Sequence, residues 1–186
     1  MYPWLRLFRI GLVSFGAGRL DHLATTRVRM RVWPTDLDFN LHVNNGRYLA
    51  LADIGRVHWF LRTGVLQAAR RHKAVPIIGD AIAKFRRDLK PFQRFEIETR
   101  MLGWDHRWGF LEHRFVREGR VIGVVAIRGV FKGPDGPVHP ATLLTALGSN
   151  ATSPALPQWI AQWHHGCDLL SQLLREQEQR HGSSEE

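Results

Sequence analysis

The feature that most constrains the fold is residues 46–63 (GRYLALADIGRVHWFLRT), which read as a helix of about five turns and are apolar on most sides. One apolar stripe runs from Tyr48 to Trp59, and a second runs from Ala50 to Leu61. A helix with so little polar surface is stable when the rest of the domain encloses it. The sequence therefore predicts a central helix wrapped by other elements.

Segments typical of β-strands lie on both sides of this helix. Residues 26–33 alternate between arginines and the apolar residues Val28, Met30 and Val32, as a half-buried strand requires. Four further strands are predicted after the helix, at residues 75–89, 95–101, 109–117 and 121–131. Because strands that are close in sequence tend to pair as antiparallel neighbours, we expect an α+β fold in which a curved sheet of about five strands surrounds one long helix.

The length of 186 residues suits one domain with terminal additions. We expect an amphipathic segment at residues 1–24, the main domain at residues 25–150, and a C-terminal helix with a frayed tail at residues 151–186. Spaced tryptophans and leucines place that helix at roughly residues 158–175. No separate second domain is predicted.

The segment between the first strand and the central helix, residues 35–48 (TDLDFNLHVNNGRY), is unusually rich in polar groups. Asp38, Asn40 and His42 alternate along it, and Asn44 or Asn45 can cap the helix. The N-terminus of a helix offers free backbone N–H groups at the positive end of its dipole. Such donors can polarise a carbonyl while a carboxylate or an imidazole activates water. The segment is therefore the candidate reaction centre.

The string from Asp36 to Tyr48 resembles the D-x-N-x-H-V-N-N-x-x-Y signature of acyl-ACP thioesterases. It is also similar to the D-x-D loop of the 4-hydroxybenzoyl-CoA thioesterase branch of the hot-dog superfamily. Residues 85–92 and 95–100 resemble the second and third strands of that branch. The resemblance covers about residues 26–132 and is greatest to THEM6-like thioesterase proteins.

The resemblance implies a hot-dog fold that works as a homodimer or homotetramer and hydrolyses acyl thioesters, most simply acyl-CoA and less readily acyl-ACP. Asp38 takes the place of the catalytic carboxylate, as general base or nucleophile, with Asn40 and His42 as its partners. Asn44, Asn45 and Tyr48 fall at the positions that hold the substrate carbonyl, the oxyanion donor being the backbone near Asn45. One subgroup has a histidine at the position of Asn45, so a mechanism that needs a second imidazole does not carry over. No cofactor and no metal are expected.

Structural alternatives remain open for several of these residues. Asp38 can cap a turn, His42 can orient the loop without transferring a proton, and Tyr48 can belong to the core. Asp53 is the alternative catalytic carboxylate, although its spacing from Arg56 favours an ion pair. Arg86 and Arg87 are candidates for binding the phosphates of coenzyme A. A position on a solvated strand edge explains these two arginines equally well.

The formal net charge of +9 fits nucleic acid, an anionic membrane or a phosphorylated substrate. No nucleic-acid-binding motif accompanies the charge, so nucleic acid is not the expected partner. Residues 1–16 are too short and too charged to span a bilayer, but they can lie in a membrane interface or pack on the domain or a partner subunit. The single cysteine, Cys167, fits a reducing compartment. We therefore expect a cytoplasmic protein, with contact to the inner membrane face as one option and a non-catalytic acyl-binding or membrane-associated module as the alternative function.

Overall fold

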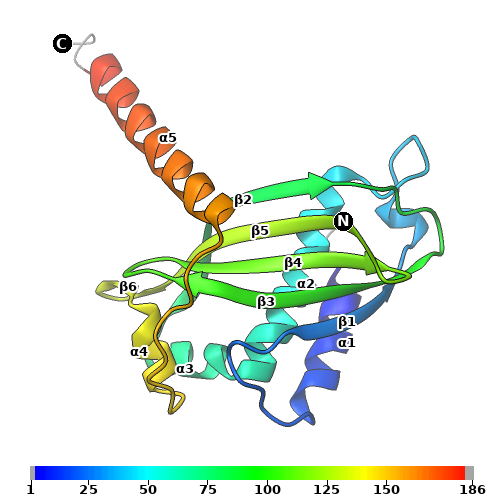
Figure 1. The fold of residues 1–186 in the computed structure, drawn as a ribbon, viewed down its shortest axis with the longest axis horizontal. Coiled ribbons are helices and arrows are strands. Elements are labelled where there is room, and N and C mark those ends of the chain that lie inside the picture. Colours follow the sequence, from blue (N-terminus) through cyan, green and yellow to red (C-terminus); the bar gives the residue numbers. More distant parts are fainter. Residues whose placement is uncertain (1–2, 183–186) are drawn as a thin grey trace. The chain divides into compact units, whose positions relative to one another are not determined.

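The computed structural model describes residues 3–182. Two compact units divide the chain, one that ends at Pro154 and one that begins at Ala155. The first unit contains the sheet and the helices α1 to α4, and the second contains α5 (Gln158–Gly182), which runs past the predicted end near residue 175 (Figure 1). Residues 1–2 of the predicted N-terminal segment and residues 183–186 of the predicted frayed tail lie outside the described residues.

All strands of the first unit belong to one antiparallel sheet, in the order β1-β3-β4-β5-β2, with the short β6 paired to β5. Consecutive strands β3, β4 and β5 are neighbours, as expected of strands joined by short connections. The two edges of the sheet are therefore β1 and β2. The strands are β1 (Thr26–Arg31), β2 (Val75–Phe85), β3 (Arg94–Trp104), β4 (Gly109–Arg117), β5 (Arg120–Gly133) and β6 (Gly136–Val138).

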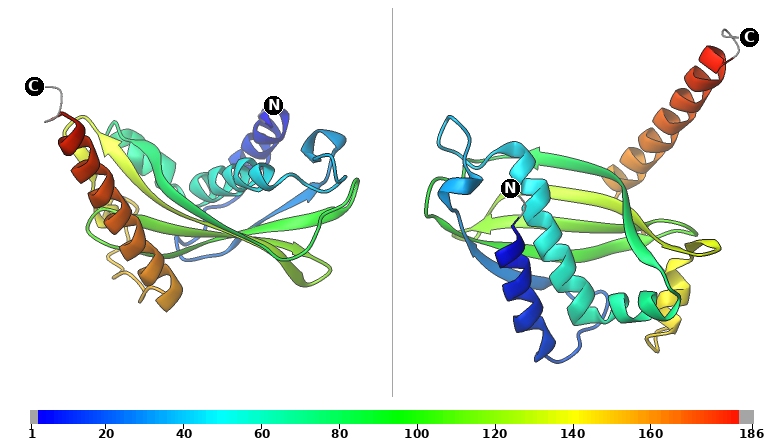
Figure 2. Two further views of the ribbon diagram at one scale, coloured as in Figure 1. Left: turned by 90° about the horizontal axis from the view of Figure 1, so that it is seen from above. Right: turned by 180° about the vertical axis from the view of Figure 1, so that it is seen from behind.

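The helix α2 (Asn45–Thr63) crosses one face of this sheet (Figure 2). Its two ends are defined by Asn44, whose side chain accepts from the Gly46 N–H at 2.9 Å, and by Gly64 in the left-handed region. At Gly55 the helix approaches the sheet closely, because a Cβ there would lie 2.6 Å from Oγ1 of Thr99. The predicted central helix enclosed by a curved antiparallel sheet is confirmed.

Two of the predicted strands are shorter in the structure. Strand β1 ends at Arg31, because Pro34 starts the 3₁₀ turn η1 (Pro34–Asp36) and the Trp33 N–H donates to the Asp36 side chain at 2.9 Å. Strand β2 ends at Phe85 instead of residue 89. There the N–H groups of the next two residues both turn to the Ile122 carbonyl, at 2.9 and 3.1 Å.

Three short elements were not predicted. No element was assigned between the central helix and the strand that starts at residue 75, and helix α3 (Val65–Arg71) lies there. Its apolar residues Val65, Ala68 and Ala69 are buried, and this tertiary packing stabilises a helix too short to be stable alone. Helix α4 (Pro140–Thr145) and strand β6 were missed for the same reason of length.

The N-terminal helix α1 (Trp4–Phe15) packs against α2 within the first unit. The Ser14 hydroxyl lies 2.8 Å from Nδ1 of His58 on α2 and donates to the Ile10 carbonyl at 2.6 Å. Burial, and to a smaller extent the charge of Arg62, lowers the pKa of His58, so this histidine is neutral at pH 7. The inner face of α1 is thus part of the domain.

Candidate active site

The candidate segment folds into a tight hairpin between η1 and α2. Leu37 and Val43 form an antiparallel bridge, and the Asp38 N–H donates to the His42 carbonyl at 2.8 Å. Leu41 at the tip has a φ of 58°, a conformation that an L-residue with a bulky side chain rarely adopts. The hairpin therefore fixes the backbone of Asp38 at the entrance of α2.

The carboxylate of Asp38 is half-buried and held by one of its oxygens. Its Oδ1 accepts from the N–H groups of Asn40 at 2.9 Å and His42 at 3.3 Å. For Oδ2 there is no hydrogen-bond partner within residues 3–182. The side chain is thus oriented by the hairpin while one oxygen stays open for other contacts.

The side chains of Asn40 and His42 do not contact that carboxylate. Asn40 is exposed, and Nε2 of His42 lies 3.6 Å from Oδ2 of Asp88, which follows β2. Asn40 and His42 therefore act on Asp38 through their backbone N–H groups. The imidazole instead connects the hairpin to the segment after β2.

The start of α2 offers a free backbone donor at Asn45. The side chain of Asn44 is the N-cap, as predicted. Asn45 is the first helical residue, and its N–H finds no acceptor in the described part of the chain. Tyr48, one turn later, is 3% exposed and packs edge-on against Phe85 and Phe115. Burial, with a smaller effect of the Asp88 charge, raises the pKa of Tyr48 to about 12, so its phenol is neutral at pH 7.

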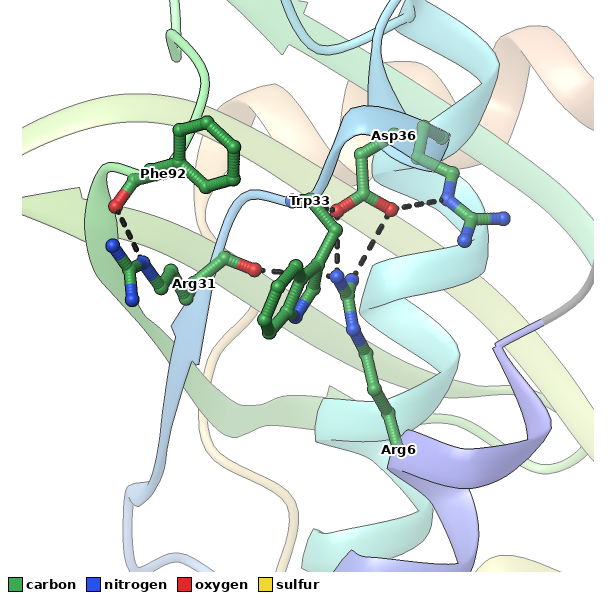
Figure 3. Close-up of polar contacts among 6 residues, drawn as sticks. Arg6, Arg31, Trp33, Asp36 and Phe92 are labelled. Carbon is green, nitrogen blue, oxygen red and sulfur yellow. Dashed lines mark hydrogen bonds and ion pairs between the residues drawn. The ribbon is translucent and has the colours of Figure 1, made fainter.

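The structural role of Asp36 was not predicted from the sequence. This residue is the centre of the polar network beside the hairpin (Figure 3). Its carboxylate is 1% exposed and accepts from Arg6 of α1 at 2.6 Å, from Arg47 of α2 at 2.7 Å and from the Trp33 N–H at 2.9 Å. Burial alone would raise the pKa of Asp36. The hydrogen bonds from Arg6, Trp33 and Arg47 and the charge of Arg6 outweigh burial and hold the pKa below its ordinary value.

Asp36 thereby joins three segments of the fold, since its partners come from α1, from α2 and from its own turn. The local sequence did carry a signal for this role. Pro34 is typical of the start of a helical turn, and an acidic residue two positions later, Asp36, can cap that turn with its carboxylate. The contact with Arg6 spans 30 residues and has no local signal.

The alternative carboxylate, Asp53, forms the predicted ion pair with Arg56 on α2. It is partly buried and lies more than two helical turns from the Asp38 hairpin. Arg86 and Arg87 are exposed and directly precede Asp88, the residue that meets His42. The fold therefore brings both arginines into the neighbourhood of the hairpin.

An apolar cavity of about 50 Å³ lies at the other end of α2. Its lining includes Trp59 and Phe60 of α2 and Pro76, Ile77 and Ile78 of the edge strand β2, and does not include Asp38. Binding cavities for small molecules are usually several times larger. In the described residues no group of three potential metal ligands comes together.

Comparison with known proteins identifies the family. A model of the thioesterase-like superfamily matches residues 32–164, which include the hairpin, α2 and the whole sheet from β2 onward. The chain belongs to the thioesterase-like superfamily. Protein THEM6 of Xenopus laevis is 34% identical over 148 residues, which cover 77% of this chain and 69% of that protein.

Solved thioesterase structures confirm the hot-dog fold. The probable thioesterase YbaW of Escherichia coli superposes with a TM-score of 0.61 at 19% identity and covers 67% of this chain and 96% of that one. A gentisyl-coenzyme A thioesterase superposes with a TM-score of 0.55 at 22% identity and covers 67% of this chain and 100% of that one. The predicted membership of the family and the predicted fold are thus both confirmed.

Proposed function

We propose that this protein hydrolyses acyl thioesters, with acyl-CoA as the substrate class and Asp38 as the reacting carboxylate. Membership of the thioesterase-like superfamily supports the reaction type. The observation that carries the role of Asp38 is its half-held carboxylate, with Oδ1 fixed by two N–H groups and Oδ2 without a partner in residues 3–182. A carboxylate fixed in this way is oriented for attack or proton abstraction without reorganisation.

Two routes are compatible with this geometry. As a general base, Asp38 takes a proton from water, whose oxygen adds to the thioester carbon, and the thiolate leaves. As a nucleophile, Asp38 adds to the same carbon and expels the thiolate, and water then hydrolyses the mixed anhydride. Both routes give a carboxylic acid and a free thiol.

The free N–H of Asn45 is the proposed donor to the thioester oxygen. The group lies at the N-terminus of α2, where the helix dipole favours developing negative charge. Because this donor is backbone, replacement of the Asn45 side chain is not expected to abolish activity. Asn40 and His42 position Asp38, and Tyr48 supports the helix start by its packing.

Arg86 and Arg87 are proposed to bind the phosphates of coenzyme A. They are exposed, and they lie next to the segment that meets the hairpin through the contact of Asp88 with His42. Arginine offers a planar fork of donors that matches phosphate oxygens. This assignment favours acyl-CoA over acyl-ACP as substrate.

The edge strand β2 supports a homodimer. Among the strands of residues 3–182 it pairs with β5 alone, and its apolar residues Val75, Ile77, Ile82 and Phe85 are exposed. A long apolar edge of this kind is a template for pairing with another chain. Two-fold pairing runs the β2 strands antiparallel, so the start of one strand lies beside the end of the other. The cavity wall at Ile77 and Ile78 in one copy would then approach the hairpin of the other copy.

Substitution of Ile77 and Ile82 by lysine tests this dimer. We expect sedimentation to show a dissociation constant raised at least about 100-fold, since two buried apolar contacts are replaced by charges. The substitution Arg29→Ala on the opposite edge, β1, is the matched control and should leave the dimer intact. Dissociation by the control alone would contradict pairing through β2.

The activity is tested with a panel of acyl-CoA substrates of different chain lengths, with release of the thiol as the readout. We expect the wild-type protein to turn over at least one of them, and Asp38→Asn to lose about 100-fold or more in kcat. Asp53→Asn is the matched control and should stay within a few-fold of the wild type. The reverse pattern would move the chemistry to Asp53, and the absence of turnover by the wild type would favour the alternative of a non-catalytic acyl-binding module.

A further inference from the structure

The outer face of α1 is apolar and exposed, although the helix is firmly attached to the domain. Leu5 and Phe8 are 87% and 69% exposed, and Trp4, Leu12 and Val13 are also largely exposed. On a helical projection these five residues occupy one half of the surface together with the exposed Arg9, and the inner half carries Arg6, Leu7, Ile10 and Ser14. An exposed face with five large apolar side chains on a folded domain indicates an interaction surface.

This face borders a groove rich in arginine. The groove has a volume of about 990 Å³ and lies between α1 and the edge strand β1, with Arg9 and Val13 of α1 among its lining residues. The other lining arginines are Arg6, Arg27, Arg29, Arg31, Arg94 and Arg117, against the two glutamates Glu96 and Glu118. The surface beside the apolar face is therefore strongly positive.

Part of this charge is uncompensated. Arg27 and Arg29 pair with Glu98 and Glu96. By contrast, Arg9, Arg31 and Arg94 have no carboxylate partner within residues 3–182. Arg31 and Arg94 also lie directly opposite each other on β1 and β3, an arrangement of like charges that costs stability unless an anion is present.

Aromatic side chains lie at the same end of the groove. Trp33 contributes to its lining and packs edge-on against Phe92, and the guanidinium of Arg31 lies 5.5 Å from the centre of the Phe92 ring. Both rings are about half exposed, and Figure 3 shows that the Trp33 backbone and the Arg6 side chain both bind Asp36. Tryptophan with neighbouring arginine is the composition that favours the boundary between lipid headgroups and acyl chains.

We propose that the outer face of α1 and the adjoining arginine groove form a docking surface for an anionic lipid bilayer. The apolar residues enter the acyl boundary, while Arg9, Arg31 and Arg94 contact the headgroup phosphates. None of the helices within residues 3–182 is long and apolar enough to cross a membrane. The contact is therefore along the surface, with α1 lying flat.

The charge selects lipid over a second copy of the chain. Two copies meeting through this face would oppose their arginine grooves, and each chain carries a formal net charge of +9. An anionic surface gains from the same charges. The ties of α1 to the domain, through Ser14 with His58 and through Arg6 with Asp36, make the face preformed and independent of thioester hydrolysis.

The test is co-sedimentation of the full chain with vesicles. We expect binding to phosphatidylcholine vesicles with about one-third phosphatidylglycerol to exceed binding to pure phosphatidylcholine at least about tenfold, and to fall in high salt. The double substitution L5E/F8E and the double substitution R9E/R94E should each reduce binding about tenfold or more. The pair L170E/L173E replaces two exposed leucines of α5 and serves as the matched control.

Unchanged thermal melting of the variants establishes that they fold, and R9E/R94E leaves the five apolar side chains of α1 unchanged. Equal binding by wild type, L5E/F8E and R9E/R94E would overturn the proposal. A loss of binding confined to the α5 control would overturn it as well. The proposal would also be overturned if the wild type bound neither kind of vesicle and instead formed an oligomer that the substitution L5E/F8E dissociates. Hydrolysis enters none of these measurements, so an inactive protein can still confirm the docking surface.

Discussion

Two neighbouring aspartates, Asp36 and Asp38, lie in regions of opposite character. The region around Asp36 is buried and joins α1 and α2 through two arginines. The region around Asp38 is half-open, and its contacts are with backbone N–H groups of its own hairpin. We infer from this difference that Asp36, whose carboxylate is bound by two arginines and the Trp33 N–H, organises the fold, and that Asp38 is the carboxylate proposed to react. The following predictions test this division of roles.

The largest expected effect is on stability, from Asp36→Ala. The substitution removes the carboxylate that pairs with two largely buried guanidinium groups, those of Arg6 and Arg47. Loss of one member of a buried ion pair costs about 3–5 kcal/mol. We expect urea denaturation to show a decrease of this size in the free energy of unfolding, and a decrease below about 1 kcal/mol would contradict the structural role of Asp36.

A smaller effect is expected from Arg6→Ala, because Arg47 and the Trp33 N–H still satisfy Asp36. The loss of one charged hydrogen-bond partner should lower the free energy of unfolding by about 1–3 kcal/mol. Hydrogen exchange should become faster in α1, which loses this tie to the loop, and remain slow in β4. Equal acceleration in α1 and in β4 would show that Arg6 does not act as a local tie.

Acid should remove the contribution of Asp36 to the stability of the fold. The pKa of Asp36 is lower in the folded state than its ordinary value of 3.8, so its contribution is complete above that value and is lost as pH falls through the folded pKa. The melting temperatures of wild type and Asp36→Asn should therefore differ at pH 7, and the difference should shrink as the pH falls below 3.8 and passes through the folded pKa. A difference that grows as the pH falls below 3.8 would contradict this linkage.

Two buried histidines, His58 and His113, lower the stability of the wild type and of Asp36→Asn equally in acid. Burial lowers the pKa of His58, and burial with the Arg56 charge lowers that of His113 to about 3. Each is neutral when folded and charged when unfolded below about pH 6.5, so stability falls from that pH downward. The comparison of wild type with Asp36→Asn cancels this contribution.

The smallest effect on stability is expected from Asp38→Asn. The amide oxygen can accept the same N–H groups of Asn40 and His42. We expect the free energy of unfolding to change by less than about 0.5 kcal/mol, measured in the same urea titration as Asp36→Ala. A large destabilisation would make Asp38 a structural residue like its neighbour.

The fold was predictable because its largest elements carry local patterns. The alternation in residues 26–31 and the apolar helix of residues 45–63 follow from side chains facing a common core. Asn44 at the helix start was likewise readable as a cap. Short elements such as α3 and β6 had no such pattern, since their stability comes from packing.

The candidate site was predictable only as a segment. The alternating Asp-x-Asp pattern does not distinguish the two carboxylates, because what separates them is the approach of Arg6 from 30 residues away. The side chain of His42 was expected beside Asp38, and the hairpin directs it to Asp88 instead. Contacts between distant segments, and the exposed outer face of α1, required the three-dimensional arrangement.

The most direct test of the account compares kcat/KM for acyl-CoA hydrolysis of Asp36→Asn and Asp38→Asn with that of the wild type. The assays are run well below the melting temperature of each variant. We expect Asp38→Asn to lose at least about 100-fold with an unchanged melting temperature, and Asp36→Asn to keep activity within about tenfold of the wild type despite a lower melting temperature. An Asp38→Asn variant as active as the wild type, beside a folded but inactive Asp36→Asn, would contradict the assignment of Asp38 as the reacting carboxylate.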